Sequence, residues 1–415
     1  MNDFKVINDP VFGFIRIPRG LLLDIVKHRL FQRLSRIKQL GMASVVYPGA
    51  QHTRFQHSLG AFHLMSEAIL SLSQKGIFIF DSEAEALKAA ILLHDVGHGP
   101  FSHVLEHTLI RDISHEEISL LMMEQINREM NGALTLAIKI FKDDYPKRFL
   151  HQLISSQLDM DRLDYLRRDS FFAGVTEGNI GSARIIKMLN VVDDRLVVEQ
   201  KGIYSIENYL TSRRLMYWQV YLHKTTVAYE KTLVNLLRRA KHLAQQGEEV
   251  FATPALRYFL YNDVDAKTFE EDPQALANYE LLDDNDIWAS VKAWMSHSDR
   301  VLSILAHDLA ERKIFRVELS EQSFDQERVR SLQQRLADVY EVSFDDAAFL
   351  ISMNTIEKDM YDPSDDQIDI LFKSNESPAD EEKVVIKDIS EASELFNISL
   401  LSKKIRKYYL CYQRI

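Results

Sequence analysis

The sequence predicts a mainly α-helical protein with a helical core and a smaller α+β domain at its C-terminal end. Two observations lead to this prediction. Through the first 250 residues, apolar side chains recur at the spacing of amphipathic helices, whereas later apolar runs are short and separated by acidic turns that contain proline and serine. We therefore expect a helical domain over residues 1–250 and an α+β domain over residues 251–415, with the boundary between 250 and 315.

Helices in the first domain are predicted from periodicity and from signals at their ends. Two periodic segments end at a glycine. Two others begin with a serine followed three residues later by a glutamate, which is the pattern of a capping box (Ser82 with Glu85, Ser114 with Glu117). The last predicted helix is long and interrupted. The expected helices are residues 24–41, 57–76, 82–97, 114–126 and 204–247.

Strands are predicted from short apolar runs that polar turns enclose. One β-hairpin is expected within the first domain, and the remaining strands belong to the second. The expected hairpin is residues 190–202, and the expected strands are residues 313–320, 347–354, 367–374 and 383–390.

The composition argues against several classes of protein. The 415 residues carry a net charge of −11, which disfavours a protein that coats nucleic acid, because neutralising phosphates requires a basic surface. The one cysteine, Cys411, permits no intrachain disulfide. The first residues lack the basic and apolar regions of a signal peptide, and no apolar run reaches the ~18 residues of a membrane span. We therefore expect a cytoplasmic protein without a membrane partner.

Imidazole and carboxylate groups are concentrated in the segment LLHDVGHGPFSH, residues 92–103. His94 and Asp95 are adjacent at the end of a predicted helix, and His98 and His103 follow a glycine-containing turn. Imidazole and carboxylate together suit borderline divalent metals. An isolated His-Asp pair is more often an ordinary hydrogen-bonded pair, but burying several imidazoles without partners would be costly. The density of the cluster therefore favours a metal site.

Further ligands for such a metal are available elsewhere in the chain. His57 lies upstream, and four aspartates lie downstream within LDMDRLDYLRRD, residues 158–169. His57, the pair His94-Asp95 and Asp161 together give the order H…HD…D. This order is similar to that of the HD-domain metal-dependent phosphohydrolases.

Several other blocks resemble one branch of that family, the deoxynucleoside triphosphate triphosphohydrolases (dNTPases). This branch includes the vertebrate SAM-and-HD-domain enzyme and bacterial relatives. The resemblance covers residues 5–250, and the matching blocks in chain order are INDPVFG, FQRLSRIKQLG, YPGAQHTRFQHSLG, LLHDVGHGPFSH, SHEE, DMDRLDYLRRD and YLHK.

The resemblance implies one divalent metal ion in each site, held by His57, His94, Asp95 and Asp161. Two nitrogen and two oxygen ligands leave positions open for water and phosphate. Such a set suits Mn, Fe, Ni, Zn or Mg, and additional Mg would accompany the nucleotide.

The implied reaction is hydrolysis of a dNTP to a deoxynucleoside plus intact triphosphate. Water attacks the α-phosphorus, and a histidine protonates the 5′ oxygen as it leaves. We assign that proton to His103, oriented by Glu106 where relatives carry an aspartate. His98 would bind phosphate oxygens, and His115 with Glu116 would fix its tautomer. The alternative for His115 is an exposed residue beside a helix N-cap.

The triphosphate requires cations, and the guanidinium fork of arginine matches phosphate oxygens. Relatives carry a lysine at the position of one candidate, Arg162. The candidates are Arg54, Arg162, Arg213 and Lys224, whereas Arg36, Arg167 and Arg168 are expected to be solvated charges on helix faces.

Selection of deoxyribose requires a wall against the 2′ position. A ribose hydroxyl pressed against an aromatic edge loses water without gaining a partner, which disfavours ribonucleotides. For two of the matching residues, Leu40 and Tyr165, ordinary core packing is the alternative. The residues that match sugar contacts of the family are Gln39, Leu40, Tyr165, Asp169 and Tyr221.

Many relatives are tetramers activated by nucleotides bound between subunits, and this pattern is only partly kept. Lys5, Val6 and Asn8 match allosteric contacts. We expect a homo-oligomer, either a dimer or a tetramer, that is constitutively active or takes a different nucleotide activator. The residues that replace polar, basic or acidic contacts of the guanine-specific site are Phe14, Lys27, Ser35 and Asn190.

Two other functions remain open on the sequence. An HD phosphohydrolase could act on another nucleotide or phosphate ester, since a fold hosts many substrates. A non-catalytic nucleotide sensor or a nucleic-acid binder would show a broken ligand set or a basic stripe. The four ligand positions are intact and the chain is acidic, so the sequence favours an enzyme.

Overall fold

The computed structural model describes residues 3–101, 104–105, 108–358, 361–362, 366–374, 383–393 and 404–415. His103 and Glu106, to which the sequence assigns catalytic roles, lie outside the described residues. The described helices are α1 Leu21–Lys27, α2 Arg29–Arg33, α3 Arg54–Gln74, α4 Asp81–Leu93, α5 His115–Glu129, α6 Thr135–Phe141, α7 Arg148–Gln152, α8 Met160–Ala173, α9 Ser182–Met188, α10 Ile203–Met216, α11 Lys224–Gln245, α12 Pro254–Tyr261, α13 Ala266–Glu271, α14 Pro273–Tyr279, α15 Asp284–Trp294, α16 Arg300–Ala310, α17 Gln326–Tyr340, α18 Phe344–Ala347 and α19 Ile389–Ala392.

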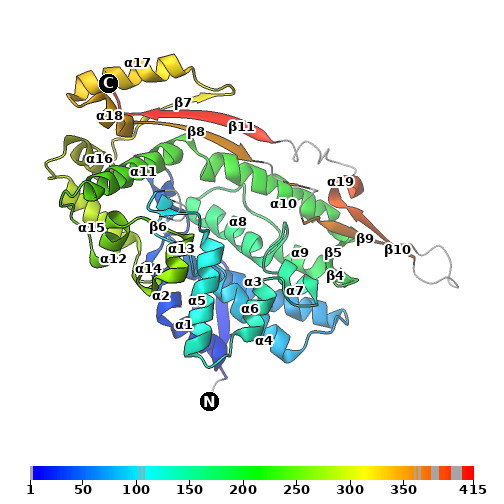
Figure 1. Ribbon diagram of the computed structural model, residues 1–415. Coiled ribbons are helices and arrows are strands. Elements are labelled where there is room, and N and C mark those ends of the chain that lie inside the picture. Colours follow the sequence, from blue (N-terminus) through cyan, green and yellow to red (C-terminus); the bar gives the residue numbers. More distant parts are fainter. Residues whose placement is uncertain are drawn as a thin grey trace.

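The described strands are β1 Phe4–Asp9, β2 Gly13–Pro18, β3 Ile110–Arg111, β4 Leu189–Val192, β5 Arg195–Glu199, β6 Val264–Asp265, β7 Arg316–Ser320, β8 Ile351–Lys358, β9 Asp369–Ser374, β10 Lys383–Asp388 and β11 Ile405–Tyr412. Helices α1–α16 make up most of the body, and the sheet of β7, β8 and β11 lies with α17 at the end opposite the N-terminus (Figure 1). The prediction of a mainly helical protein with a smaller α+β C-terminal region is therefore confirmed.

The last part of helix α4 is buried in the helical core. All five residues of its last turn and a half, from Ala89 to Leu93, have no exposed surface. A helix that is apolar all round belongs in a protein interior. It contacts α1, α3 and α6. The His94-Asp95 pair directly follows Leu93, so α4 delivers both side chains into the interior.

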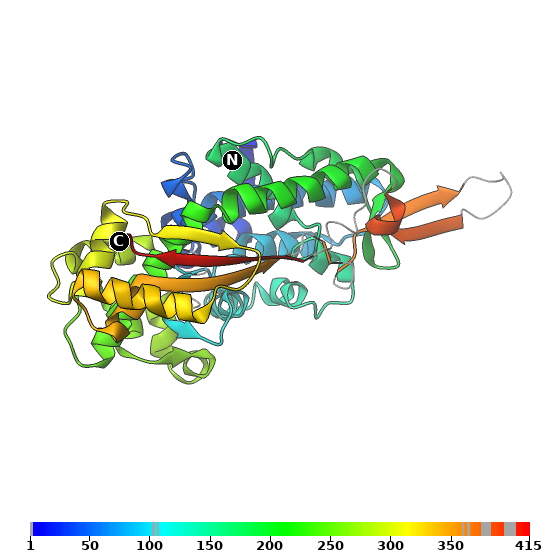
Figure 2. The same cartoon turned by 90° about the horizontal axis from the view of Figure 1, so that it is seen from above.

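Two sheets use strands from the C-terminal region. In the first, β11 is central and pairs antiparallel with both β7 and β8 (Leu410 opposite Glu318 and Met353). In the second, the hairpin β4–β5 is extended by β9, which pairs parallel with β5, and then by β10. The β9–β10 ribbon projects beyond the helical body (Figure 2). Residues before and after position 250 thus share one sheet.

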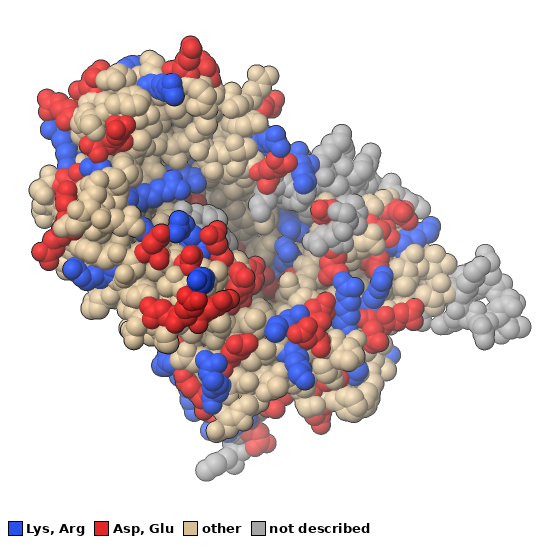
Figure 3. Space-filling model, in the orientation of Figure 1, with Lys and Arg blue, Asp and Glu red and all other residues tan. Residues whose placement is uncertain are grey.

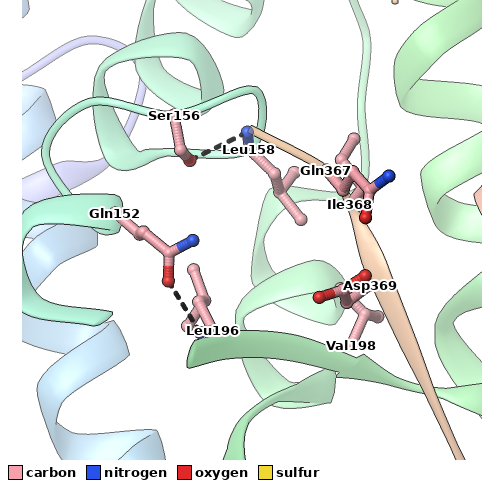
Figure 4. A pocket seen from close by; sticks show the side chains of 8 residues that line it. All are labelled: Gln152, Ser156, Leu158, Leu196, Val198, Gln367, Ile368 and Asp369. Carbon is pink, nitrogen blue, oxygen red and sulfur yellow. Dashed lines mark hydrogen bonds between the residues drawn. The ribbon is translucent and has the colours of Figure 1, made fainter. Parts of the chain in front are cut away.

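A small pocket marks the junction where β9 joins β5. Gln152 from α7 and Asp369 from β9 both line it, together with residues of β5 (Figure 4). The amide oxygen of Gln152 accepts a hydrogen bond from the backbone N–H of Leu196 at 2.8 Å. The hairpin is therefore fixed to the helical core by a side chain at the pocket wall.

Several predicted elements differ from the observed ones. The expected helix 24–41 is broken, because His28 adopts an extended conformation and its ring nitrogen accepts the N–H of Leu30, which starts a new helix. The expected helix 82–97 is instead α4, which ends at Leu93. Its cap is also different: Glu83, rather than Glu85, accepts the N–H of the N-cap residue Phe80.

Other predictions agree with the structure. The Ser114–Glu117 capping box is present at the start of α5. The hairpin 190–202 corresponds to β4–β5, and the long interrupted helix corresponds to α10 and α11, which a single π-helical turn over Tyr217–Tyr221 separates. The strand expected at 347–354 begins only at Ile351, because Phe344–Ala347 is helical. Strands β1, β2, β3, β6 and β11 have no counterpart among the predicted strands.

Helices α3 and α8 pack closely where Gly60 faces α8. A β-carbon at Gly60 would lie 1.9 Å from Asp164 Oδ1 and 2.1 Å from Arg168 Nη2. We expect Gly60→Ala to lower the free energy of unfolding by about 1–3 kcal/mol, because overpacking forces both side chains to shift. Urea unfolding measures this. Gly181→Ala is the control, since its β-carbon would meet only Arg184 Cβ at 3.9 Å; an equal loss in both variants would contradict the close-packing argument.

Candidate metal and phosphate site

Three helices bring three candidate metal ligands together. His57 comes from the first turn of α3, His94 follows the end of α4, and Asp161 comes from the first turn of α8. Among the described residues, one ligand atom from each lies within 4.8 Å of the other two. The Nε2 atoms of the two rings are 3.2 Å apart, and Asp161 Oδ1 lies 3.0 Å from His57 Nε2 and 3.6 Å from His94 Nε2.

Both rings are oriented by their other nitrogen. His57 Nδ1 donates to Asp164 Oδ2 at 2.7 Å, and His94 Nδ1 donates to the carbonyl oxygen of Ile91 at 2.7 Å. In the neutral rings, both Nε2 atoms therefore carry a lone pair directed at the same point. Two buried lone pairs and a half-buried carboxylate that face one another favour a cation among them. The three residues thus fit a divalent metal ion, with the tautomers fixed as metal-binding histidines require.

Without a metal, a proton takes the place of that cation. Burial lowers the pKa of His57, but hydrogen bonds with Asp161 and Asp164 outweigh it and raise the pKa to about 10. Hydrogen bonds with His57 and His94 hold the pKa of Asp161 well below its usual range, against the effect of burial. The electrostatics therefore favour positive charge at the centre of the cluster.

The fourth proposed ligand, Asp95, lies beside these three. Its Oδ1 is 3.4 Å from His94 Nε2, and its Oδ2 is 3.6 Å from His57 Nε2. Arg54 donates to the same Oδ2. Burial raises the pKa of Asp95, but the charges of His98, His94 and Arg54 outweigh burial and hold the pKa well below its usual range. The carboxylate therefore stays ionised. Asp95 is thus shared between the cluster and the guanidinium of Arg54.

The loop after α4 is held by side chains from distant segments. Ser119 Oγ donates to the carbonyl of His94 and accepts from the N–H of Gly97. Arg33, which is fully buried, donates to the carbonyls of Val96 and His98. Tyr279 donates to the carbonyl of Gly97, and Asp284 accepts the N–H of Phe101. The loop therefore has little freedom to move.

The two loop glycines permit this close packing. A β-carbon at Gly97 would lie 2.2 Å from the backbone nitrogen of Ser119, and one at Gly99 would lie 2.9 Å from the hydroxyl of Tyr279. Neither residue has a positive φ. They accommodate α5 and Tyr279, and the helix has already ended before them.

Among the described residues, the proposed catalytic group comprises His98, His115 and Glu116. His98 is buried, and its Nδ1 lies 3.3 Å from Asp95 Oδ1. The rings of His98 and His115 are in contact, with centroids 3.9 Å apart. Glu116 Oε1 lies 3.3 Å from His115 Nε2, and its side chain is mostly exposed. The structure thus places His115 against His98, with Glu116 on the solvent side of His115.

The proposed sugar contacts form a connected wall. Tyr221 donates to Asp169 Oδ2 at 2.9 Å, and Asp169 Oδ1 interacts with His52 Nε2 at 2.7 Å. The rings of Tyr165 and Tyr221 pack edge to face, with their centroids 6.1 Å apart. The backbone N–H of Gln39 donates to the backbone carbonyl of His52. The half-buried side chain of Leu40 packs against the core. Asp169 is buried and already engaged by two side chains.

The candidate cations differ in their surroundings. Arg162 Nε donates to the carbonyl of Ser156 and lies 3.2 Å from Asp159 Oδ2. Arg213 is buried on α10, and within the described part of the chain its Nε and Nη1 have no hydrogen-bond partner. Lys224 is exposed at the start of α11. Arg54 faces Asp95, as described above.

The prediction that Arg168 is a solvated charge is wrong. Its side chain has no exposed surface, and it pairs with Asp164 and with Asp9 of the N-terminal hairpin. Arg36 is half exposed but pairs with Asp283, and Arg167 lies over the ring of Phe12. On that hairpin, Lys5, Val6 and Asn8 are exposed, and Phe14 is 73% exposed.

Sequence reasoning did not assign the supporting roles of six residues: Arg33, Ser119, Asp164, Arg168, Tyr279 and Asp284. Asp164 and Arg168 could have been found, because residues 161, 164 and 168 share one helical face. Arg33 and Asp284 carry no local signal, since their hydrogen-bond partners lie 63 to 249 positions away in the chain. No helix of the described chain is long and apolar enough to span a membrane.

The buried carboxyl group of Asp284 makes the stability of the fold depend on pH. Burial raises its pKa to about 6, although the N–H groups of Lys38 and Phe101 favour the ionised form. Because this pKa exceeds the unfolded value of 3.8, the carboxyl group stabilises the fold most below pH 4, and this contribution is lost as pH rises through 6.

We therefore expect Asp284→Asn to flatten the dependence of stability on pH between 4 and 6. Between pH 4 and 6, the free energy of unfolding should therefore fall by about 1–2 kcal/mol less in the variant than in the wild type. Urea unfolding at pH 4, 5, 6 and 7 measures it, with exposed Asp263→Asn as the control. An unchanged slope in Asp284→Asn would show that this carboxyl does not titrate there.

Comparisons with known proteins agree with this geometry. A model of the HD domain matches residues 54–169, and a model of the HD-associated region matches residues 180–266. The crystal structure of a phosphohydrolase from Bacteroides thetaiotaomicron is 64% identical and gives a TM-score of 0.94, covering 99% of this chain and 100% of that chain. A hypothetical protein from Aquifex aeolicus is 26% identical with a TM-score of 0.70, covering 99% and 97%.

Two sequence relatives show the range of the similarity. The uncharacterized protein YwfO of Bacillus subtilis is 32% identical over 88% of this chain and 84% of its own length. Human deoxynucleoside triphosphate triphosphohydrolase SAMHD1 is 31% identical over 54% of this chain and 42% of its own length. HD domains bind a divalent metal, and His57, His94 and Asp161 offer the candidate site here. The chain therefore belongs to the HD-domain phosphohydrolase superfamily.

Proposed function

We propose that this protein is a metal-dependent dNTPase that releases a deoxynucleoside and intact triphosphate. The observation that carries the proposal is the convergence of His57, His94 and Asp161 beside the contacting rings of His98 and His115. The similarity to SAMHD1, whose name states this reaction, supports the choice of substrate.

The chain would hold the metal through His57, His94, Asp95 and Asp161. A divalent ion there supplies stabilisation of charge on phosphoryl oxygens and makes water more acidic. Arg54 holds the Asp95 carboxylate ionised and in place. His98 faces Asp95 with one ring nitrogen and would use the other for a phosphate oxygen.

The reaction breaks the bond between the α-phosphorus and the 5′ oxygen. A water oxygen bonds to the phosphorus, and the 5′ oxygen leaves with a proton. We assign that proton to His103, with Glu106 as the group that orients its ring. A histidine suits this transfer near neutral pH.

Cations for the triphosphate would come from Arg162, Arg213 and Lys224. Arg213 is the strongest of these candidates, because its buried Nε and Nη1 lack a hydrogen-bond partner among the described residues and would gain one from phosphate. Figure 3 shows a face hollowed near its centre, with acidic and basic side chains interspersed and no continuous basic stripe among the described residues in view. On this face, the charge pattern does not provide the basic surface that nucleic acid requires.

Product analysis tests the proposal. Purified protein is incubated with each dNTP and NTP plus Mn or Mg, and nucleoside, monophosphate and triphosphate are resolved by ion-exchange chromatography. We expect deoxynucleoside with intact triphosphate. The double variant His94→Ala/Asp95→Ala should lose turnover by at least 10³-fold, because charge stabilisation at the reacting phosphoryl is lost.

The exposed His307–Glu311 pair provides a matched control for that double variant, and its alanine substitutions should leave turnover unchanged. Release of orthophosphate or pyrophosphate would indicate another HD phosphohydrolase reaction. Turnover only in nucleotide mixtures would reveal a required activator. A large rate increase with GTP or dGTP would contradict our expectation that the guanine-specific site is altered.

The aromatic wall predicts sugar selectivity. Tyr221 is held by Asp169 and faces Tyr165, so its edge cannot yield to a 2′-hydroxyl. We expect Tyr221→Ala to lower the ratio of kcat/KM for a dNTP over the matching NTP by about 10-fold or more. Tyr204→Ala, on the exposed face of α10, is the control. An unchanged ratio in Tyr221→Ala would remove this residue from the sugar site.

A further inference from the structure

The metal ligand His57 is connected to the N-terminal hairpin by a chain of buried charged groups. His57 Nδ1 donates to Asp164 Oδ2 at 2.7 Å. Arg168 donates to both oxygens of Asp164, with Nε at 2.9 Å from Oδ2 and Nη2 at 3.0 Å from Oδ1. The remaining nitrogen of the fork, Arg168 Nη1, donates to Asp9 Oδ2 at 2.7 Å. Asp9 is the last residue of β1.

This chain of contacts is closed to solvent at every link. The side chains of His57, Asp164 and Arg168 have no exposed surface, and that of Asp9 is 4% exposed. The guanidinium of Arg168 therefore has both carboxylates as its charge partners and cannot exchange them for water. Gly60 allows α3 to lie directly against the Asp164–Arg168 pair, since a β-carbon there would collide with both.

The position of Asp9 is itself fixed. Its second oxygen, Oδ1, accepts the N–H groups of Val11 and Phe12 at 2.9 Å each, which closes the turn between β1 and β2. The ring of Phe12 then lies beside the guanidinium of Arg168, 5.6 Å from its centre. Strand β2 is anchored by Ile15 and Ile17, both fully buried. The hairpin thus presents one carboxylate to Arg168 at a defined place.

We propose that Asp9 is a positioning residue for the metal site, acting on His57 through Arg168 and Asp164. The physical basis is the sharing of one positive charge between two carboxylates. While Asp9 takes part of the guanidinium charge, Asp164 keeps enough negative charge to accept the His57 proton strongly, which makes Nε2 a better metal ligand. Without Asp9, the whole positive charge falls on Asp164, and both the basicity and the orientation of His57 are weakened.

Nothing in the family matches assigns this role, because Asp9 lies outside residues 54–169 and 180–266. The inference rests on the metal site of the proposed function but not on its substrate. Metal binding alone can therefore test it, and a failure of the dNTP assignment would leave the test valid.

The experiment is titration of metal-depleted protein with Mn²⁺ at pH 7.5, followed by the electron paramagnetic resonance signal of the free ion. We expect Asp164→Asn to weaken Mn²⁺ binding about 10–100-fold, as for other partners of metal-binding histidines. Asp9→Asn should weaken it several-fold in the same direction. Asp9→Glu, which keeps the charge, should recover part of the affinity. Asp3→Asn, an exposed carboxylate before the same hairpin, is the matched control.

A double-mutant cycle separates this role from general destabilisation. If Asp9 acts through Asp164, adding Asp9→Asn to Asp164→Asn should cause no further loss of Mn²⁺ affinity. Fully additive losses, or a wild-type Mn²⁺ affinity in folded Asp9→Asn, would overturn the proposal. Circular dichroism and thermal unfolding confirm that each variant is folded. A lower melting temperature with unchanged affinity would assign Asp9 a purely structural role.

Discussion

The site depends on one constraint, which is that three metal-binding atoms must be held face to face inside the protein. His57 Nε2, His94 Nε2 and Asp161 Oδ1 approach to between 3.0 and 3.6 Å. Such groups repel one another unless a cation lies among them. Folding must therefore bring them together with a proton or a metal ion among them. The protein does so by fixing each imidazole through its second nitrogen and by burying both rings between packed helices.

The same constraint explains why the supporting residues come from so many parts of the chain. A loop that carries His98 only a few residues after a buried helix must satisfy its own backbone groups, because buried carbonyl and N–H groups without partners are costly. Ser119, Arg33 and Tyr279 form hydrogen bonds with backbone groups of this loop between positions 94 and 98. Tyr279 and Asp284 belong to a segment that neither family model covers, so the C-terminal part of the chain helps to build the site.

Sequence patterns were sufficient for groups that are close in the chain or repeated along one helix. The His94-Asp95 pair stands at the end of an apolar segment that predicts a helix. Asp161, in contrast, is singled out among four aspartates only by the resemblance to the HD family, since no helix is predicted around it. The helix expected over 24–41 failed because a single side chain, His28, caps a new helix in the middle of an apolar pattern. The contact of Arg168 with Asp9 could not be predicted, because Asp9 lies 159 positions away and an arginine on a helix face has the same sequence pattern whether it faces solvent or a distant aspartate.

The charges in and around the cluster favour a divalent cation among the ligand atoms. Asp95 contacts Arg54, and Asp9 and Asp164 contact Arg168. Asp161 joins this set of four aspartates and two arginines through His57. With both imidazoles neutral, this connected set carries two negative charges in excess. Buried charge without a counter-ion is strongly disfavoured, and a network of this kind contributes little net stability over an apolar core. One divalent cation among the ligand atoms would neutralise the set. The two buried arginines thus reduce the excess charge of the four aspartates to the value that one divalent ion can balance.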